Sequence, residues 1–259
     1  MALVETEDRG AVRHVILNRP EKRNAIHGEL VLAIGAALKA AADDPAVRVV
    51  VVRGAGPIFS SGMDFGALGA VAARPELLRA FRRECIDAWN RAEEMTKPVI
   101  AQIHGGCIGG AVELAIAADF RVMADDAVIG MPETRVGLIP DVGGSSRLPA
   151  LVGLGRAKEL IMTGKLIGAA EAERIGLVTR VAPAGQLDDA TAQLADELLA
   201  CAPLAVGLAK RVLDAVAKPT LAASLEQEAA AQQLCAQSQD FAEGAQALAE
   251  KRPPQFSGR

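Results

Sequence analysis

Glycines and carboxylates in the middle of the chain carry the clearest chemical signal of this sequence. A glycine-rich segment, Gly105–Gly110, precedes Glu113, and two more acidic residues, Glu133 and Asp141, follow in a stretch rich in glycine and proline. Two neighbouring carboxyl groups can divide acid and base roles, one removing a proton while the other delivers one. The pattern therefore favours proton-transfer chemistry.

We expect the glycine segment to form a turn between a strand over 99–104 and a helix that begins near Gly110. The first N–H groups of a helix have no partner within it, and the helix dipole is positive there. Such groups can stabilise an oxyanion, and Glu113 lies on the same side of the first turn. The segment lacks the glycine orders of nucleotide-binding loops, so a nucleotide site is disfavoured.

Each carboxylate also has a structural interpretation. Glu113 can simply complement the helix dipole, and acidic residues on loops such as those of Glu133 and Asp141 are usually solvated. Asp141 can also cap its own loop through an Asx turn, since it lies between Pro140 and Gly143. Only the combination of the three favours catalysis.

Composition predicts a folded globular chain and excludes several classes of function. The 259 residues are 51% hydrophobic and 23% charged, which indicates one large domain or a domain with a smaller helical appendage. A net charge of −4 disfavours nucleic acid and anionic membranes as partners. The longest apolar stretch, 99–118, is interrupted by polar residues and glycines, so we expect no membrane span.

Location and cofactors are predicted from the N-terminal residues and from the cysteines and histidines. The first eight residues are acidic and do not resemble a signal peptide, so we expect a cytoplasmic location. The four cysteines are widely separated from one another and form no C-x-x-C pair. This spacing gives no metal signature, and we expect neither a metal nor another cofactor.

Strand and helix signals alternate through the first two thirds of the chain, which predicts an α/β fold. From Leu187 onward the composition favours helices, and Pro203 and Pro219 indicate three of them, followed by a loose tail over 253–259. The strands are expected at 4–6, 11–17, 47–52, 99–104, 120–124 and 128–130, the helices at 28–42, 75–96 and 111–118, and a loop at 132–146.

Several short segments, in this order, resemble the crotonase superfamily, also called the enoyl-CoA hydratase/isomerase family. The resemblance spans nearly the whole chain. It rests on Leu17–Pro20 with Asn24 and Ala25, Phe59–Asp64, Lys97–Ala101, Gly105, Gly109–Glu113, Pro132–Pro149, Thr163–Val178 and Phe241–Lys251.

The resemblance implies a crotonase-like spiral of ββα units over 1–195 and a C-terminal helical trimerisation subdomain over 196–259. It also implies a homotrimer or a dimer of trimers that acts on an acyl-CoA thioester. The N–H groups of Met63 and Gly110 would bind the thioester oxygen. Contacts to CoA would come from six residues, the last of them from a neighbouring subunit: Arg23, Ala25, Ser61, Asp64, Phe65 and Lys251.

Glu113 and Glu133 match the two glutamates of the hydratases. The resemblance therefore implies an enoyl-CoA hydratase, in which Glu113 activates water and Glu133 delivers a proton to give a 3-hydroxyacyl-CoA. Asp141 matches an acid of the dienoyl-CoA isomerases, so an isomerase that shifts a double bond is the alternative. A non-catalytic acyl-CoA or RNA-binding scaffold is disfavoured, since both glutamates are present and Lys39 is the one basic residue of the first helix.

Overall fold

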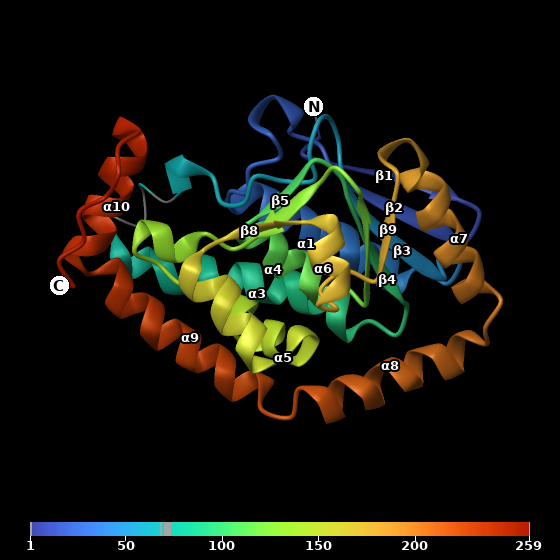
Figure 1. The fold of residues 1–259 in the computed structure, drawn as a ribbon. Helices are drawn as coiled ribbons and strands as arrows, with labels where there is room; N and C mark the ends of the chain where they lie inside the picture. The colour runs from blue at the N-terminus through green and yellow to red at the C-terminus, as the bar shows by residue number, and fades with distance from the viewer. Residues whose placement is uncertain (1, 68, 70–73, 259) are drawn as a thin grey trace.

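Runs of β-branched residues form the centre of the main sheet. The computed structural model describes residues 2–67, 69 and 74–258. The chain opens with an antiparallel hairpin of β1 (Val4–Arg9) and β2 (Val12–Leu17), as predicted. Four parallel strands follow in the order β3 (Val49–Gly54), β4 (Val99–Ile103), β6 (Phe120–Ala124) and β9 (Arg180–Ala182) (Figure 1).

A second, three-stranded sheet contains part of the glycine-rich segment. Its order is β5 (Gly106–Ile108), β7 (Val128–Gly130) and β8 (Leu166–Gly168). The prediction of a turn over the whole of Gly105–Gly110 was therefore wrong for its middle. Cys107 is fully buried and pairs with Ile129 of β7, and a strand of three residues is too short to show an alternating pattern.

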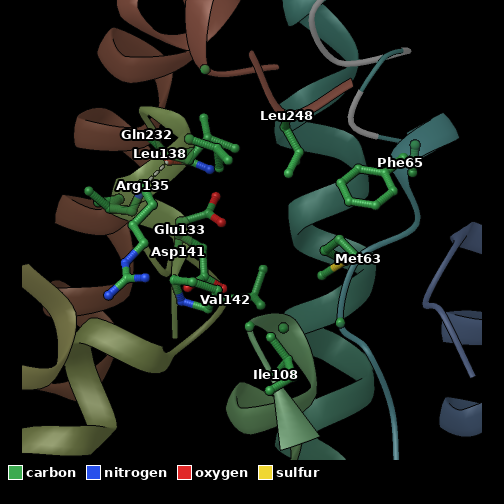
Figure 2. Close-up of a pocket in the computed structure, with 18 of the residues that line it drawn as sticks. Met63, Phe65, Ile108, Glu133, Arg135, Leu138, Asp141, Val142, Gln232 and Leu248 are labelled. Carbon is green, nitrogen blue, oxygen red and sulfur yellow. Dashed lines mark hydrogen bonds between the residues drawn. The ribbon is translucent and has the colours of Figure 1, made fainter. Parts of the chain in front are cut away.

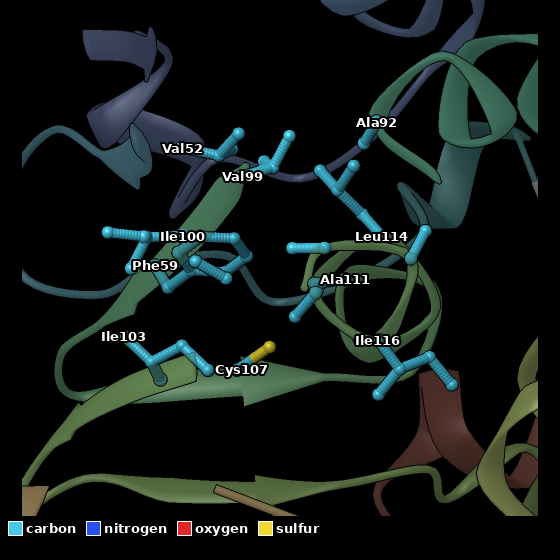
Figure 3. Close-up of a cluster of buried hydrophobic side chains, with 14 of the residues drawn as sticks. Val52, Phe59, Ala92, Val99, Ile100, Ile103, Cys107, Ala111, Leu114 and Ile116 are labelled. Carbon is cyan, nitrogen blue, oxygen red and sulfur yellow. The ribbon is translucent and has the colours of Figure 1, made fainter. Parts of the chain in front are cut away.

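Helices α1 (Gly28–Asp43) and α3 (Leu78–Glu94) pack against each other, and α3 also contacts α4 (Gly110–Ala117). All residues of α4 are buried. Figure 3 shows α4 against β4 and β5, where apolar side chains fill the space between them, among them Phe59, Ile100, Ile103, Cys107, Ala111 and Leu114. Because its surroundings are apolar, Glu113 in this helix requires specific polar partners.

The chain then continues through α5 (Gly144–Thr163) and α6 (Ala169–Arg174). The first turn of α5 is fixed by Arg147, whose guanidinium donates to Glu93 of α3 at 3.0 and 2.7 Å. In the described ranges, four short 3-10 helices lie between the main elements: η1 (Pro20–Lys22), η2 (Pro75–Leu77), η3 (Glu133–Val136) and η4 (Ala184–Gln186).

After Leu187 the described part of the chain forms four helices: α7 (Leu187–Leu199), α8 (Pro203–Ala217), α9 (Leu221–Ala236) and α10 (Gln239–Glu250). The prediction of three was wrong. No proline marks the break between α9 and α10, where the Ser238 hydroxyl accepts from the N–H of Phe241 at 3.1 Å and caps α10. The boundary expected at 195 falls within α7, and the two-part division stays a prediction.

The last two helices return to the body of the molecule. Figure 1 shows α9 passing α3 and α5 on its way to α10, while α8 crosses below at a distance from the sheets. The tail after α10 has no regular secondary structure, yet the N–H groups of Gln255 and Ser257 donate to Glu243 and Asp240. It is therefore held against α10 rather than loose.

Among the residues that the structure describes, no helix has the length and apolar character needed to cross a membrane.

Candidate active site

A cavity of about 360 Å³ lies between the end of the second sheet and helices α3, α9 and α10. Figure 2 shows Glu133 and Asp141 on one wall and Met63 with Phe65 on the other. The cavity brings together the five residues predicted to be catalytic and two of those predicted to contact CoA, namely Met63, Gly110, Glu113, Glu133, Asp141, Ser61 and Phe65.

Two isolated strand-like contacts place Met63 beside the start of α4. Ser60 pairs with Cys107 of β5, and Met63 pairs with Ile26. Gly62 has φ +84°, and a Cβ there would lie 2.4 Å from the carbonyl oxygen of Ile108. Only glycine fits so close an approach, which brings the Met63 side chain against Gly110.

The backbone N–H groups of Met63 and Gly110 donate to no other group among the described residues. For Gly110 the reason is its place as the first residue of α4, where no carbonyl of the helix precedes it. The helix dipole adds positive potential at the same point. This corner of the cavity can therefore bind a carbonyl oxygen and stabilise negative charge that develops on it.

Glu113 is the one acidic residue of α4, and its side chain is 2% exposed. Its Oε1 accepts from the N–H groups of Val142 and Gly144, both at 2.9 Å. Burial raises the pKa of Glu113 well above its ordinary value, and the neighbouring Glu133, Asp141 and Glu228 raise it further. Oε2 accepts from no donor among the described residues, so it can accept a proton from a ligand in the cavity.

Glu133 begins η3, directly after Pro132. Its Oε1 lies against Gly109, where a Cβ would come within 2.8 Å and where φ is +56°. Its Oε2 is buried with no hydrogen-bond partner in the described part of the chain. Burial raises the pKa of Glu133 to about 7, so this carboxyl can hold a proton near neutral pH and release it to a reacting atom.

Asp141 has a cationic neighbour, and Glu133 has none among the residues that the structure describes. The Nε of Arg82 lies 3.7 Å from Asp141 Oδ2 and donates to the Asp141 carbonyl at 2.7 Å. Burial raises the pKa of Asp141 to about 8, since the opposing effect of Arg82 is smaller and Glu228 and Glu133 add to the rise. Oδ2 has no hydrogen-bond partner among the described residues, so Asp141 can also hold a proton.

The carboxylate of Glu228, on α9, accepts hydrogen bonds from the same turn that donates to Glu113. It accepts from the N–H groups of Gly143, at 2.9 Å, and Ser146, at 2.6 Å, and from the Ser146 hydroxyl. Its Oε2 also lies 3.7 Å from the guanidinium of Arg82. The carboxylate thus fixes the same turn, 142–146, whose N–H groups bind Glu113.

Four of the residues predicted to contact CoA do not line the cavity. The carbonyl of Arg23 accepts from the N–H of Ser61 at 3.0 Å, and Ala25 lies next to Ile26 in the same segment. Asp64 is paired with Arg19 at 2.6 Å, and its other oxygen accepts from Gly66. Lys251 is exposed at the end of α10 with φ +55°.

Three residues of the site were not found from the sequence: Arg82, Glu228 and Gln232. Arg82 occupies a position on the buried stripe of α3 that runs through Leu78, Cys85 and Trp89, so its spacing was a usable signal. Glu228 and Gln232 gave none, because α9 is rich in alanine and glutamine and has no clear apolar stripe.

Within the described ranges, no three His, Cys, Asp or Glu side chains are grouped as metal ligands. The expectation that no cofactor is needed stays a prediction.

Comparison with known proteins decides the family. The model of the enoyl-CoA hydratase/isomerase family matches residues 7–259. The chain belongs to this family. A crotonyl-CoA hydratase of Syntrophomonas wolfei is 37% identical over 255 residues, which cover 98% of this chain and 96% of that protein. An enoyl-CoA isomerase/hydratase of Mycosarcoma maydis is 35% identical, with 96% and 93% covered.

Solved structures of family members confirm the crotonase-like fold predicted from the sequence. The structure of an enoyl-CoA hydratase from Mycobacterium avium subsp. paratuberculosis superposes with a TM-score of 0.89 at 30% identity and covers 99% of each chain. A carnitinyl-CoA hydratase from Mycobacterium avium gives a TM-score of 0.87 at 33% identity, again with 99% of each chain covered. Membership of the family is therefore supported by sequence and by fold.

Proposed function

We propose that this protein is an enoyl-CoA hydratase, which adds water to the 2,3 double bond of a 2-enoyl-CoA. The observation that carries the proposal is the meeting of Glu113 and Glu133 in one cavity, beside two backbone N–H groups without a partner among the described residues. The names of the crotonyl-CoA hydratase and enoyl-CoA hydratase relatives support the same activity.

In the proposed reaction the thioester oxygen accepts hydrogen bonds from the N–H groups of Met63 and Gly110. These donors stabilise the enolate that forms when a nucleophile adds to C3, and one such preorganised donor contributes about 3 kcal/mol to the transition state. Both donors are backbone groups, and the close contacts at Gly62 and Gly109 set their positions. These contacts therefore matter more than the identity of the Met63 side chain.

Proton transfer divides between the two glutamates. The pair keeps a proton near neutral pH because burial raises the pKa of both carboxyls. The two N–H groups on Glu113 stabilise its ionised form, so we assign the negative charge to Glu113 and the proton to Glu133. Glu113 then takes a proton from water as the oxygen bonds to C3, and Glu133 gives its proton to C2.

CoA itself is proposed to lie along the segments that pair around Ile26 and Met63. The exposed Phe65 and the Ser61 backbone border the cavity, and Arg23 lies next to them through its bond to Ser61. Ala25 offers backbone contacts, while Asp64 is proposed to orient this loop through Arg19. Lys251 is proposed to meet a CoA phosphate bound to a neighbouring subunit.

An isomerase is the second candidate, and the position of Asp141 favours it. Its Oδ2 is buried without a hydrogen-bond partner among the described residues, in the same cavity as Glu133. Two such acids can move a proton along an acyl chain and shift a double bond. The ion pair of Asp141 with Arg82 gives it a structural role as well, and for this reason hydration is the first proposal.

The oligomeric state and the cellular location are also proposals. A homotrimer or a dimer of trimers is supported by an apolar face of α8 that the described residues leave exposed. Nucleic acid and membranes are not proposed as partners. The cytoplasmic location and the absence of a cofactor stay predictions from the sequence, and some relatives are named as mitochondrial enzymes.

The first test is hydration of crotonyl-CoA by wild type and Glu133→Gln. We expect the wild type to remove the absorbance of the conjugated thioester and to give a product heavier by one water. Glu133→Gln should lower kcat by at least about 100-fold, since it cannot deliver the proton. Glu29→Gln, on the exposed side of α1, is the matched control and should retain full activity.

An outcome in favour of the isomerase would look different. The wild type would leave crotonyl-CoA unchanged and would convert a 3,5-dienoyl-CoA into the 2,4-dienoyl-CoA, whose double bonds are conjugated with the thioester. Asp141→Asn would abolish that conversion.

A further inference from the structure

Gln232 is an unusual side chain for the wall of an apolar cavity. It lies on α9, is 4% exposed and lines the cavity among Leu78, Leu138, Ala247 and Leu248. Burying an amide in such surroundings is unfavourable unless its polar atoms find partners. The partners of this side chain therefore indicate what the cavity binds.

One end of the Gln232 amide is fixed by the backbone. Its Oε1 accepts from the N–H of Ile139 at 3.0 Å. A backbone N–H can bond only to the oxygen of the amide, so this contact also fixes the orientation of the Nε2 group. Nε2 donates to no acceptor among the described residues, although it carries two N–H bonds.

The location of Gln232 relative to the reacting groups is visible in Figure 2. Glu133 and Asp141 lie between Gln232 on one side and Ile108 on the other, and Ile108 adjoins the N–H groups proposed to bind the thioester. An acyl chain that starts at the thioester and passes Glu133 would reach Gln232 beyond its double bond. Gln232 thus faces the distal part of the substrate.

The charges nearby restrict the acceptor. Glu113, Glu133 and Asp141 line the same cavity, and so do three arginines that already have acceptors. Arg82 lies against Asp141 and Glu228, Arg252 is paired with Glu243 and Glu250, and Arg135 donates to the carbonyl of Thr163. A carboxylate on the acyl chain would therefore find no cation without a partner among the described residues and would be repelled by the ionised Glu113, whereas a neutral oxygen would not. The donor at Nε2 fits a hydroxyl or a carbonyl.

We propose that Gln232 selects enoyl-CoA substrates whose acyl chain carries a neutral oxygen, a hydroxyl or a carbonyl, beyond the double bond. The inference rests on the proposed hydratase function and names its substrate class. A site built to donate a hydrogen bond discriminates against the analogue that lacks the acceptor, because the buried donor is then left without a partner. Gln232 is thus a specificity-determining residue.

The test compares hex-2-enoyl-CoA with its 5-oxo, 5-hydroxy and 6-hydroxy derivatives. For the wild type we expect kcat/KM to be about tenfold higher for at least one oxygenated substrate, the size that one neutral hydrogen bond supports. Gln232→Met keeps the volume and removes the donor, and it should abolish the preference. Because the preference is a ratio within one variant, a loss of correctly folded enzyme does not change it.

Gln233→Met is the matched control on the same helix. The Gln233 side chain accepts from Arg79 at the surface and does not line the cavity, so its replacement should leave the preference intact. The inference is overturned if the wild type prefers none of the oxygenated substrates, or if Gln232→Met retains the preference. If the wild type hydrates none of the four thioesters, the proposed function itself fails.

Discussion

At the scale of single residues, the buried carboxyl group of Asp141 makes the stability of the folded protein depend on pH. Burial raises its pKa in the folded protein to about 8, against about 3.9 for an aspartate in an unfolded chain. Between these values the folded state holds a proton that the unfolded state has lost. The free energy of unfolding therefore falls as pH rises through this window.

Asp141→Asn removes this titration and should flatten the pH dependence. As pH rises from 6 to 9, the free energy of unfolding of the variant should increase by about 2 kcal/mol relative to that of the wild type. This is less than the whole difference between the folded and unfolded pKa values would give. Urea unfolding at several pH values measures the difference. Asp43→Asn, on an exposed side chain, should run parallel to wild type. Parallel curves for Asp141→Asn as well would contradict the assigned burial cost.

The sequence was informative for residues whose position alone defines their chemistry. Glu113, Glu133 and Asp141 were predicted and they meet in one cavity, because a glycine-rich segment before a helix and a Gly/Pro-rich loop are local signals. Gln232 was not predicted, because its role depends on α9 packing back against the cavity, and no local sequence pattern indicates that packing. A buried polar side chain on an alanine-rich helix looks like any solvated one.

At the scale of elements, α9 is coupled to the active site through Glu228. This carboxylate and the guanidinium of Arg82 lie in the interior, where hydrogen bonds to a charged group are worth more than at the surface. The turn over 142–146 receives Glu228 on one side and Glu113 on the other. The C-terminal helices therefore take part in shaping the reaction centre.

Glu228→Ala should weaken both the fold and the catalytic step. It leaves the N–H groups of Gly143 and Ser146 without their acceptor and removes one of the two carboxyl groups beside Arg82, so we expect a loss of about 3 kcal/mol in the free energy of unfolding. In the fraction that folds, kcat for crotonyl-CoA should fall while KM changes little, because Glu228 orients Glu113 and does not contact the substrate.

Two further variants separate positioning from general destabilisation. Glu226→Ala, on the exposed side of α9, should change stability by less than about 0.5 kcal/mol and leave kcat unchanged. Glu228→Gln retains an acceptor for the turn and should recover part of kcat. A loss of kcat for Glu228→Ala with no recovery in Glu228→Gln would point to the charge, rather than to the hydrogen bonds, as the positioning force.

Element prediction succeeded for long signals, whereas among the strands of three residues it placed β7 and missed β5, β8 and β9. The helix over 28–42 and the strand over 120–124 were correctly placed, because apolar residues recur at helical spacing in the first and make up the second apart from Arg121. The three residues of β5 carry no such pattern, and its pairing with β7 is a long-range effect. Likewise, a serine N-cap such as Ser238, between α9 and α10, is a weaker sequence signal for a helix boundary than a proline.

At the scale of the whole molecule, α8 is anchored along one side only. Lys210 donates to the carbonyl of Ala92 at 2.7 Å and pairs with Asp119 at 2.8 Å, and Gly207 approaches Thr96 closely. The opposite side is apolar and exposed, with residues at i, i+4 spacing that no described element covers: Leu204, Leu208, Val212 and Val216. A contiguous apolar face of this kind is typical of a protein–protein contact.

A second copy of this chain is the occupant that we propose for that face, since the family resemblance implies a trimer built through the C-terminal helices. Leu208→Asp combined with Val212→Asp places two charges on the face and should shift the assembly from three chains toward one in light scattering. The contact is apolar, and buried charges without partners oppose it. Leu32→Asp, on the exposed side of α1, adds the same kind of charge elsewhere and should leave the assembly intact.

A double variant that remains trimeric, or a wild type that is monomeric at micromolar concentration, would remove α8 from the interface. If the trimer does separate, a rise in KM for CoA substrates with little change in kcat would connect the assembly to Lys251, the residue proposed to reach a neighbour's CoA phosphate.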